Sequence, residues 1–143
     1  MFKKQTALKI AVIVLVAVAL MDLIRGYMHT FNIWYASENI AQMTQTPDTM
    51  NLMNTFGITN FLTAGIFLLI VIKAKELAPY VLLLIPTTYL IGIVSARVTG
   101  VAAMQVSAWN GQYMLFVYWA VCILVGVNYF ISARRENGLK ENQ

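Results

Sequence analysis

Two long stretches of the chain, residues 77–96 and 98–133, contain no charged residue. A helix of about 20 predominantly apolar residues crosses the roughly 30 Å hydrocarbon core of a bilayer. The strands of a membrane β-barrel would alternate polar and apolar residues, and these stretches do not. We therefore expect an all-α bundle in one domain, residues 1–133, followed by a polar cytoplasmic tail, residues 134–143. The sequence predicts four transmembrane helices, over residues 10–29, 52–72, 79–99 and 112–133.

The composition supports a membrane protein and excludes several other classes. Hydrophobic residues make up 59% of the chain and charged residues 11%, whereas a soluble domain has about 25% charged residues. The net charge of +4 is modest and the basic residues form no continuous patch, so we expect no nucleic-acid partner. With one cysteine and one histidine, the chain lacks the side chains for an internal disulfide, a CxxC pair or a zinc cage. We expect no metal and no cofactor.

The basic residues predict the orientation of the bundle. Of the ten Lys and Arg residues, Arg25 and Arg97 fall on one side of the predicted spans. The other eight fall on the opposite side: Lys3, Lys4, Lys9, Lys73, Lys75, Arg134, Arg135 and Lys140. Cytoplasmic loops carry an excess of Lys and Arg, so both termini are expected in the cytoplasm and the protein in the plasma membrane.

The first span contains the most informative polar residues. Its apolar part, residues 10–21, covers only about 18 Å at helical rise, which is too short to cross the bilayer. The helix must therefore continue past Asp22, Arg25 and His29. Their spacing of i, i+3 and i+7 places them on one helical face. Charges inside a bilayer cost several kcal/mol and turn inward to pair, so we expect an ion pair between Asp22 and Arg25.

Polar residues on the other spans lie at a similar depth, counted in residues from the cytoplasmic ends. They predict a polar pocket in the outer half of the bundle. We expect its ligand-binding residues to be Asp22, Arg25, His29, Asn60 and Arg97, with Asn32, Glu38, Tyr118 and Trp119 around them. A structural ion-pair network that orients the helices is the alternative for the same residues. No residue is assigned a catalytic role.

The first outer connection begins with amphipathic aromatic residues, which favour the headgroup level of a membrane. Ile33, Ala36 and Ile40 follow helical spacing and predict a helix lying at the outer interface. Thr46 or Asp48 is expected to cap the second span.

Small residues and a proline predict how the helices pack. Gly57 and Gly65 are expected to make packing contacts on the second span. Gly92, Ala96 and Gly100 form a stripe of small residues that allows close approach of helices. We expect this stripe to pack inside the monomer, with an oligomer contact as the alternative. Pro86 should kink the third span.

The span number, the chain length and the basic flanks resemble those of the small four-helix bacterial membrane proteins of the DoxX-like and BphX-like group. Two stretches, residues 22–29 and 35–41, look like motifs, but neither matches a motif of known chemical role. The resemblance implies a bacterial cytoplasmic membrane and assigns no functional residue.

Several functions fit these features. The leading hypothesis is a binding or accessory protein for a small polar, anionic or lipid-like ligand. A structural subunit of a larger membrane complex is the first alternative. An oligomeric channel or transporter, lined by Arg25 or Arg97, is the second. A membrane enzyme with His29 as acid–base group and Asp22 orienting it is the third, although the two lie about 10 Å apart along the helix axis. Phosphate loops and hydrolase motifs are absent from the sequence. The expected partners are the lipid bilayer and a second copy or a larger complex.

Overall fold

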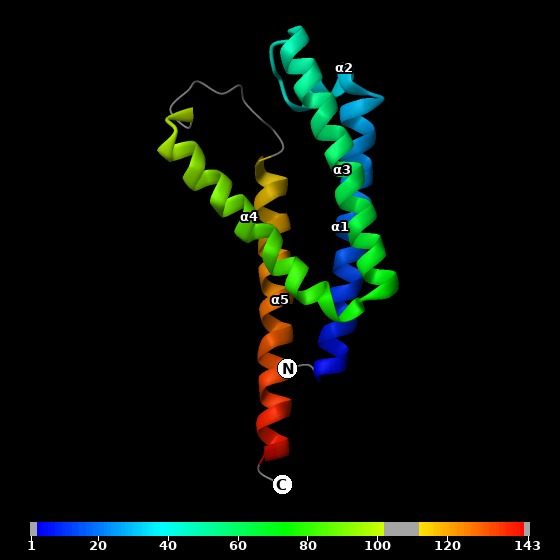
Figure 1. The fold of residues 1–143 in the computed structure, drawn as a ribbon, viewed down its shortest axis with the longest axis vertical. Helices are drawn as coiled ribbons and strands as arrows, with labels where there is room; N and C mark the ends of the chain where they lie inside the picture. The colour runs from blue at the N-terminus through cyan, green and yellow to red at the C-terminus, as the bar shows by residue number, and fades with distance from the viewer. Residues whose placement is uncertain (1–2, 102–111, 142–143) are drawn as a thin grey trace.

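The computed structural model describes residues 3–101 and 112–141, and all the regular structure within those ranges is helical (Figure 1). Residues 102–111, which hold most of the predicted second outer connection, lie outside the described part. Short helical segments occupy both described connections: α2 (Ile33–Tyr35), the π-helix η1 (Ala36–Ile40) and the 3-10 helix η2 (Lys75–Leu77). Within the described ranges four helices are long and apolar enough to cross a membrane: α1 (Lys4–Thr30), α3 (Pro47–Lys73), α4 (Ala78–Val98) and α5 (Gln112–Glu141).

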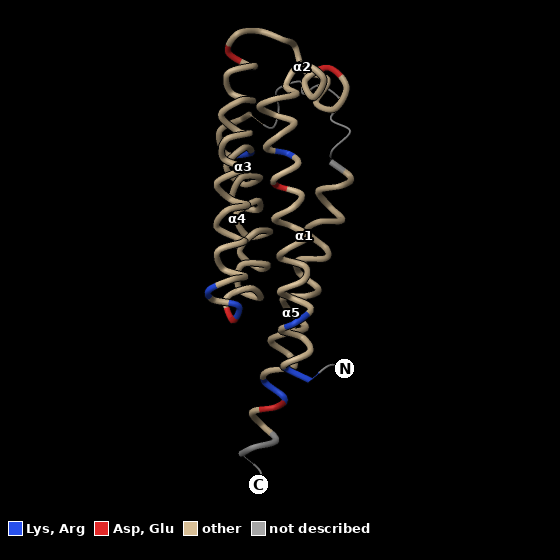
Figure 2. Tube along the Cα trace, turned by 90° about the vertical axis from the view of Figure 1, so that its right-hand side faces the viewer, with Lys and Arg blue, Asp and Glu red and all other residues tan. Residues whose placement is uncertain are grey.

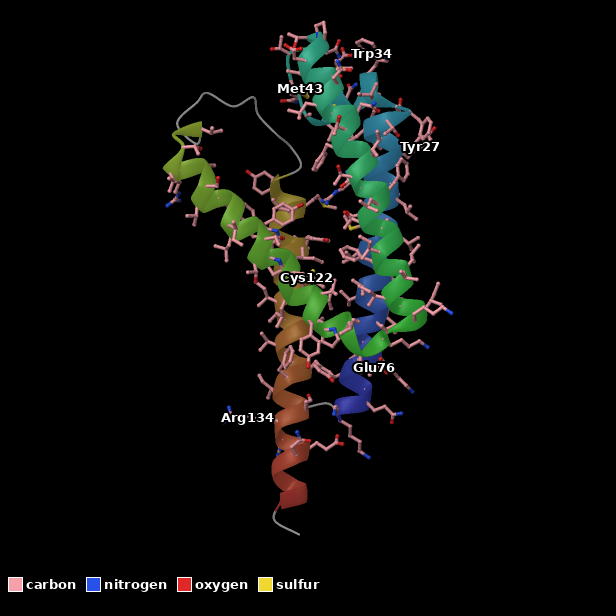
Figure 3. The ribbon with its side chains drawn as sticks, in the orientation of Figure 1. Tyr27, Trp34, Met43, Glu76, Cys122 and Arg134 are labelled. Carbon is pink, nitrogen blue, oxygen red and sulfur yellow. The ribbon has the colours of Figure 1, made fainter. Side chains whose placement is uncertain are left out.

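Helix α1 is the centre of the bundle, because it contacts α3, α4 and α5. Both chain termini lie at one end of the bundle, which we call the terminal end, and α2 lies at the other, the α2 end (Figure 1). Trp34 and Met43 lie at the α2 end, whereas Glu76 and Arg134 lie toward the terminal end (Figure 3). Most Lys and Arg residues gather toward the terminal end (Figure 2). The order of the four long helices therefore agrees with the predicted spans.

The helix ends follow local sequence signals. Thr46 caps α3: its hydroxyl accepts from the Thr49 backbone N–H, and the Thr49 hydroxyl accepts from the Thr46 N–H. Pro47 occupies the first position of α3 and Asp48 its first turn, where a carboxylate favours the helix dipole. The predicted cap at Thr46 is thus confirmed. At the other end of the chain, α5 continues to Glu141, so most of the predicted tail is helical.

Helix α1 runs unbroken through its charged residues, as its short apolar part requires. The side chains between the helices are mainly small or aliphatic, whereas many large apolar side chains face outward; Ile13, Ile72 and Leu124 are each more than 60% exposed. An outer surface this apolar suits a lipid environment. The buried apolar cluster consists of Ala11, Leu15, Val18, Ala19, Phe67, Ala78, Leu82, Ile85, Tyr118 and Cys122.

The glycines differ in what surrounds them. A Cβ added at Gly57 would lie 2.7 Å from Thr30 Cγ2 and 2.9 Å from His29 Cβ, so α1 and α3 approach closely there. Among the described residues, none lies within 4 Å of a Cβ added at Gly65, Gly92 or Gly100. The packing role is confirmed at Gly57. It is wrong at Gly65, and Gly92 and Gly100 of the small-residue stripe meet no neighbour among the described residues, because this whole part of α4 lies away from the other helices.

Helix α4 diverges from the bundle beyond its proline. Pro86 is buried inside α4, where it lacks the N–H that would bond a carbonyl four residues earlier. The hydroxyls of Thr87 and Thr88 donate to the carbonyls of Leu83 and Ile85, each at 2.8 Å. Toward the α2 end, α4 leans away from α1 and α3 (Figure 1), and every residue from 90 to 101 except Ala96 is exposed. This divergence leaves room for a cavity between α3 and α4.

Candidate functional site

An ion pair lies inside the helix bundle on α1. Asp22 is only 5% exposed, and its Oδ1 lies 3.6 Å from Arg25 Nη1. The i, i+3 spacing brings the two side chains together because residues three apart share one helix face. A separation of 3.6 Å gives electrostatic attraction but exceeds the normal range for a hydrogen bond. The two charges are therefore paired without satisfying the guanidinium N–H donors.

The Arg25 guanidinium is held by an aromatic ring as well. It lies over the ring of Tyr118 on α5, 5.5 Å from the ring centroid, within the range of a cation–π contact. Its side chain retains 23% exposure. Guanidinium carries five N–H donors, and the nearby Asp22 Oδ1, 3.6 Å from Nη1, lies beyond normal hydrogen-bond distance. Arg25 is thus a cation in a fixed position, and its guanidinium N–H groups can donate to a ligand.

His29 is positioned by α3. The side-chain Nδ2 of Asn60, which is 8% exposed, donates to His29 Nδ1 at 3.4 Å. Because Nδ1 accepts in this geometry, the neutral ring carries its proton on Nε2. The ring of Phe56 lies beside the imidazole, with 5.3 Å between centroids. The close approach at Gly57 brings α3 near enough for both contacts.

Two cavities adjoin this cluster. The first, which we call the chamber, has a volume of about 290 Å³, and Arg25 is its one fully charged lining residue, joined by His29. The second, which we call the cleft, has a volume of about 270 Å³ and lies between α3 and α4, with Asp22 as its one charged lining residue. The ion pair therefore presents its cation to one cavity and its anion to the other. The remaining chamber residues are Met21, Ile24, Met28, Ile40, Phe56, Tyr89, Met114 and Leu115.

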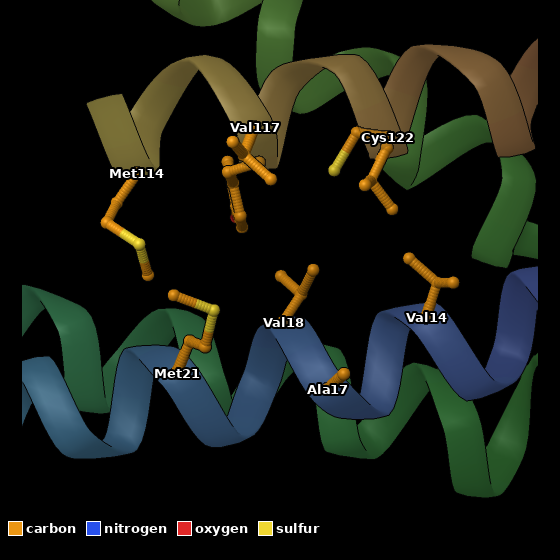
Figure 4. A pocket seen from close by; sticks show the side chains of 9 residues that line it. Val14, Ala17, Val18, Met21, Met114, Val117 and Cys122 are labelled. Carbon is orange, nitrogen blue, oxygen red and sulfur yellow. The ribbon is translucent and has the colours of Figure 1, made fainter. Parts of the chain in front are cut away.

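A third cavity, of about 180 Å³, lies between α1 and α5 and has no charged lining residue. Val14, Val18 and Met21 of α1 face Met114 and Val117 of α5 across it (Figure 4). Its lining is mainly aliphatic and methionine side chains, which suits apolar groups, so of these three cavities the chamber and the cleft are the ones that offer charged side chains.

The structure brings together five of the residues that the sequence placed in the pocket or around it: Asp22, Arg25, His29, Asn60 and Tyr118. His29 contacts Asn60, and no contact joins it to Asp22 among the described interactions. The geometry thus shows no Asp22–His29 dyad.

Four other predicted residues lie apart from both cavities. Arg97 is exposed on the diverging part of α4, and Glu38 is exposed on η1. The Asn32 Nδ2 group lies 3.6 Å from the sulfur of Met28. Trp119 packs against Tyr89, with 5.4 Å between ring centroids, so it lies behind a residue that lines both cavities.

Sequence reasoning missed the threonines of the cleft. Thr59 and Thr63 on α3 and Thr88 on α4 line it. The hydroxyls of Thr59 and Thr63 donate to the carbonyls of Thr55 and Thr59, at 2.8 and 2.9 Å. The i, i+4 repeat of threonines at 55, 59 and 63 is the signal that could have identified this wall.

The arrangement suits recognition of an anion more than any covalent step. A planar guanidinium and an imidazole N–H line the chamber, and both can donate to a carboxylate or phosphate. Among residues 3–101 and 112–141, no group of three His, Cys, Asp or Glu residues lies close enough to hold a metal ion. Comparisons of the chain with protein-family models, with curated proteins and with solved structures find no match.

Proposed function

We propose that the chain is an integral protein of a plasma membrane, with both termini in the cytoplasm and the α2 end at the outer face. Four helices of sufficient length and apolarity support this proposal. So does the gathering of Lys and Arg toward the terminal end, as expected for cytoplasmic loops (Figure 2). The exposed aromatic residues Tyr27, Phe31 and Trp34 would then lie near the outer headgroups, together with the short helical segment of α2 and η1.

In that orientation the protein acts as a binding protein for a small anionic molecule, held in the chamber of the outer half. The observation that carries this proposal is the state of Arg25. Its guanidinium is fixed by Asp22 and by the Tyr118 ring, borders the chamber, and lies beyond normal hydrogen-bond distance of the Asp22 Oδ1 that it pairs with. An anionic oxygen would supply those acceptors, with His29 as a second donor.

The test measures binding of decanoate to the protein in lipid nanodiscs. We expect Arg25→Gln to weaken binding at least about tenfold, since a hydrogen bond to a charged group contributes roughly 1.5–3 kcal/mol. Arg97→Gln is the matched control, because Arg97 lies on the exposed part of α4 and lines neither cavity. It should change the affinity by less than about twofold.

Arg25→Gln also leaves Asp22 as an unpaired charge in the bundle, and this can unfold the protein. The double variant Asp22→Asn/Arg25→Gln avoids that problem, because it replaces the ion pair with two neutral polar side chains and leaves no unpaired charge. Its helicity should match that of the wild type, while decanoate binding is lost. A helical double variant with wild-type affinity for decanoate would refute the proposal.

A further inference from the structure

The chamber and the cleft meet at two aromatic side chains. Phe56 of α3 and Tyr89 of α4 line both cavities. Each cavity alone is slightly smaller than the roughly 300–1,000 Å³ of a typical small-molecule site. A ligand that occupies both would fall inside that range, and it would have to pass between Phe56 and Tyr89.

The cleft differs from the chamber in what it can accept. It follows α3 from Phe56 to Phe67, a distance of about 16 Å at helical rise, toward the middle of the bundle. Its wholly apolar lining residues are Phe56, Phe67, Val81, Leu84 and Ile85, and they alternate with threonines, tyrosines, Asn60 and Asp22. The hydroxyls of Thr59 and Thr63 donate to carbonyls of their own helix. They therefore keep their hydrogen bonds when a hydrocarbon chain lies against them.

We propose that the ligand is an acidic amphiphile with a single hydrocarbon chain, which enters sideways from the outer leaflet between α3 and α4. Its acidic group lies in the chamber against Arg25 and His29. Its chain passes between Phe56 and Tyr89 and extends along the cleft. This inference rests on the proposed anion-binding function and adds the class of ligand, its pose and its route.

Charge fixes the direction in which such a ligand lies. Arg25 attracts an acidic group into the chamber, whereas the Asp22 carboxylate repels it from the cleft. The acidic group therefore lies toward the α2 end and the chain toward the middle of the bundle, which is also the orientation of a lipid in the outer leaflet.

The volume of the cleft limits the ligand to one chain. A volume of about 270 Å³ is roughly nine times the ~30 Å³ that one water molecule occupies in the liquid. A methylene group is close to a water molecule in size, so one chain of roughly nine carbons, the number in decanoate beyond its carboxyl carbon, fills the cleft. A diacyl lipid would have to leave its second chain outside, between the protein and the bilayer.

The test blocks the cleft and leaves the chamber open. Thr63→Trp places a large ring inside the cleft, because Thr63 lines it and its hydroxyl bonds only within α3. Leu62→Trp is the matched control, since Leu62 is 64% exposed and lines neither the cleft nor the chamber. The probes are decanoate and acetate, which share the acidic group and differ in the chain.

We expect Thr63→Trp to weaken decanoate binding at least tenfold and to change acetate binding less than twofold, while Leu62→Trp changes neither. Equal decanoate affinities in the two tryptophan variants would overturn the inference, and the dependence on Arg25 would still support the anion site. Decanoate binding that is insensitive to Asp22→Asn/Arg25→Gln would instead refute the proposed function itself.

A second measurement uses the unmodified protein, in case Thr63→Trp does not fold. Decanoate bearing a photoreactive diazirine in mid-chain is cross-linked in nanodiscs, and the labelled peptides are identified by mass spectrometry. We expect labels between residues 56 and 67 and between residues 81 and 89, competed away by excess decanoate. Labels that are not competed, or that fall only outside these two segments, would contradict the proposed pose.

Discussion

The close approach of α1 and α3 at Gly57 makes the effect of one methyl group predictable. An added Cβ would lie 2.7 Å from Thr30 Cγ2, 2.9 Å from His29 Cβ and 3.0 Å from the His29 carbonyl carbon. Carbon atoms in normal contact are about 3.5–4.0 Å apart, so the two helices would have to separate by about 1 Å. The backbone carbon of His29 cannot rotate out of the way, unlike a side chain.

The expected cost of Gly57→Ala follows from two opposing terms. Inserting a methyl group into a packed interior costs about 1–3 kcal/mol. Alanine recovers up to about 1 kcal/mol through its better helix propensity. The net loss of unfolding free energy should be about 1–2 kcal/mol. Separation of the helices should also break the contact between His29 and Asn60, which is already 3.4 Å long, and weaken decanoate binding.

The assay is unfolding in mixed micelles with increasing denaturing detergent, followed by helical circular dichroism. Gly65→Ala is the matched control on the same helix, because its added Cβ has no neighbour within 4 Å. Only the propensity term applies there, so Gly65→Ala should be neutral or up to about 1 kcal/mol stabilising. If Gly57→Ala proves as stable as Gly65→Ala, the close packing of α1 and α3 at this point is refuted.

Two further substitutions test the ion pair and the helix cap. Asp22→Ala should lower the unfolding free energy by about 3 kcal/mol, the low end of the range for breaking a buried pair, because Arg25 is partly exposed. In the same unfolding assay, a loss as small as that of Asp22→Asn/Arg25→Gln would argue against an uncompensated charge. Thr46→Ala should cost about 1 kcal/mol and speed amide hydrogen exchange over residues 47–50, because α3 loses its capping hydroxyl. Unchanged exchange there would mean that the cap does not hold the start of α3.

Much of the bundle could be predicted from the sequence, because the number of residues along a helix determines how deep in the membrane each residue lies. The apolar part of α1 is too short to cross a bilayer, so Asp22, Arg25 and His29 had to lie within the helix. Asn60 on α3 was matched to them by the same counting. These residues do share one region of the structure, beside the chamber and the cleft.

Depth alone does not fix the direction in which a side chain points. Arg97 has the right depth for the cluster, but α4 diverges beyond Pro86 and leaves Arg97 exposed. The direction of a helix depends on the packing of its neighbours, which no count of residues along one helix reveals. The threonines of the cleft were missed for a different reason. A threonine hydroxyl in a helix commonly bonds a carbonyl of its own helix, so a single threonine gives little sign of a cavity wall, and only the i, i+4 repeat points to one.

The central position of α1 has a consequence for how the protein is made. Synthesis proceeds from the N-terminus, so α1, with Asp22 and Arg25, leaves the ribosome before every helix that covers it. Helix α3 can pair with α1 early, because it is the next long helix in the chain. The Tyr118 ring that lies over Arg25 arrives only with α5, which follows α1, α3 and α4 in the chain. Until then the guanidinium lacks its aromatic neighbour, so a nascent chain stalled before α5 would expose an incomplete site to quality-control proteases.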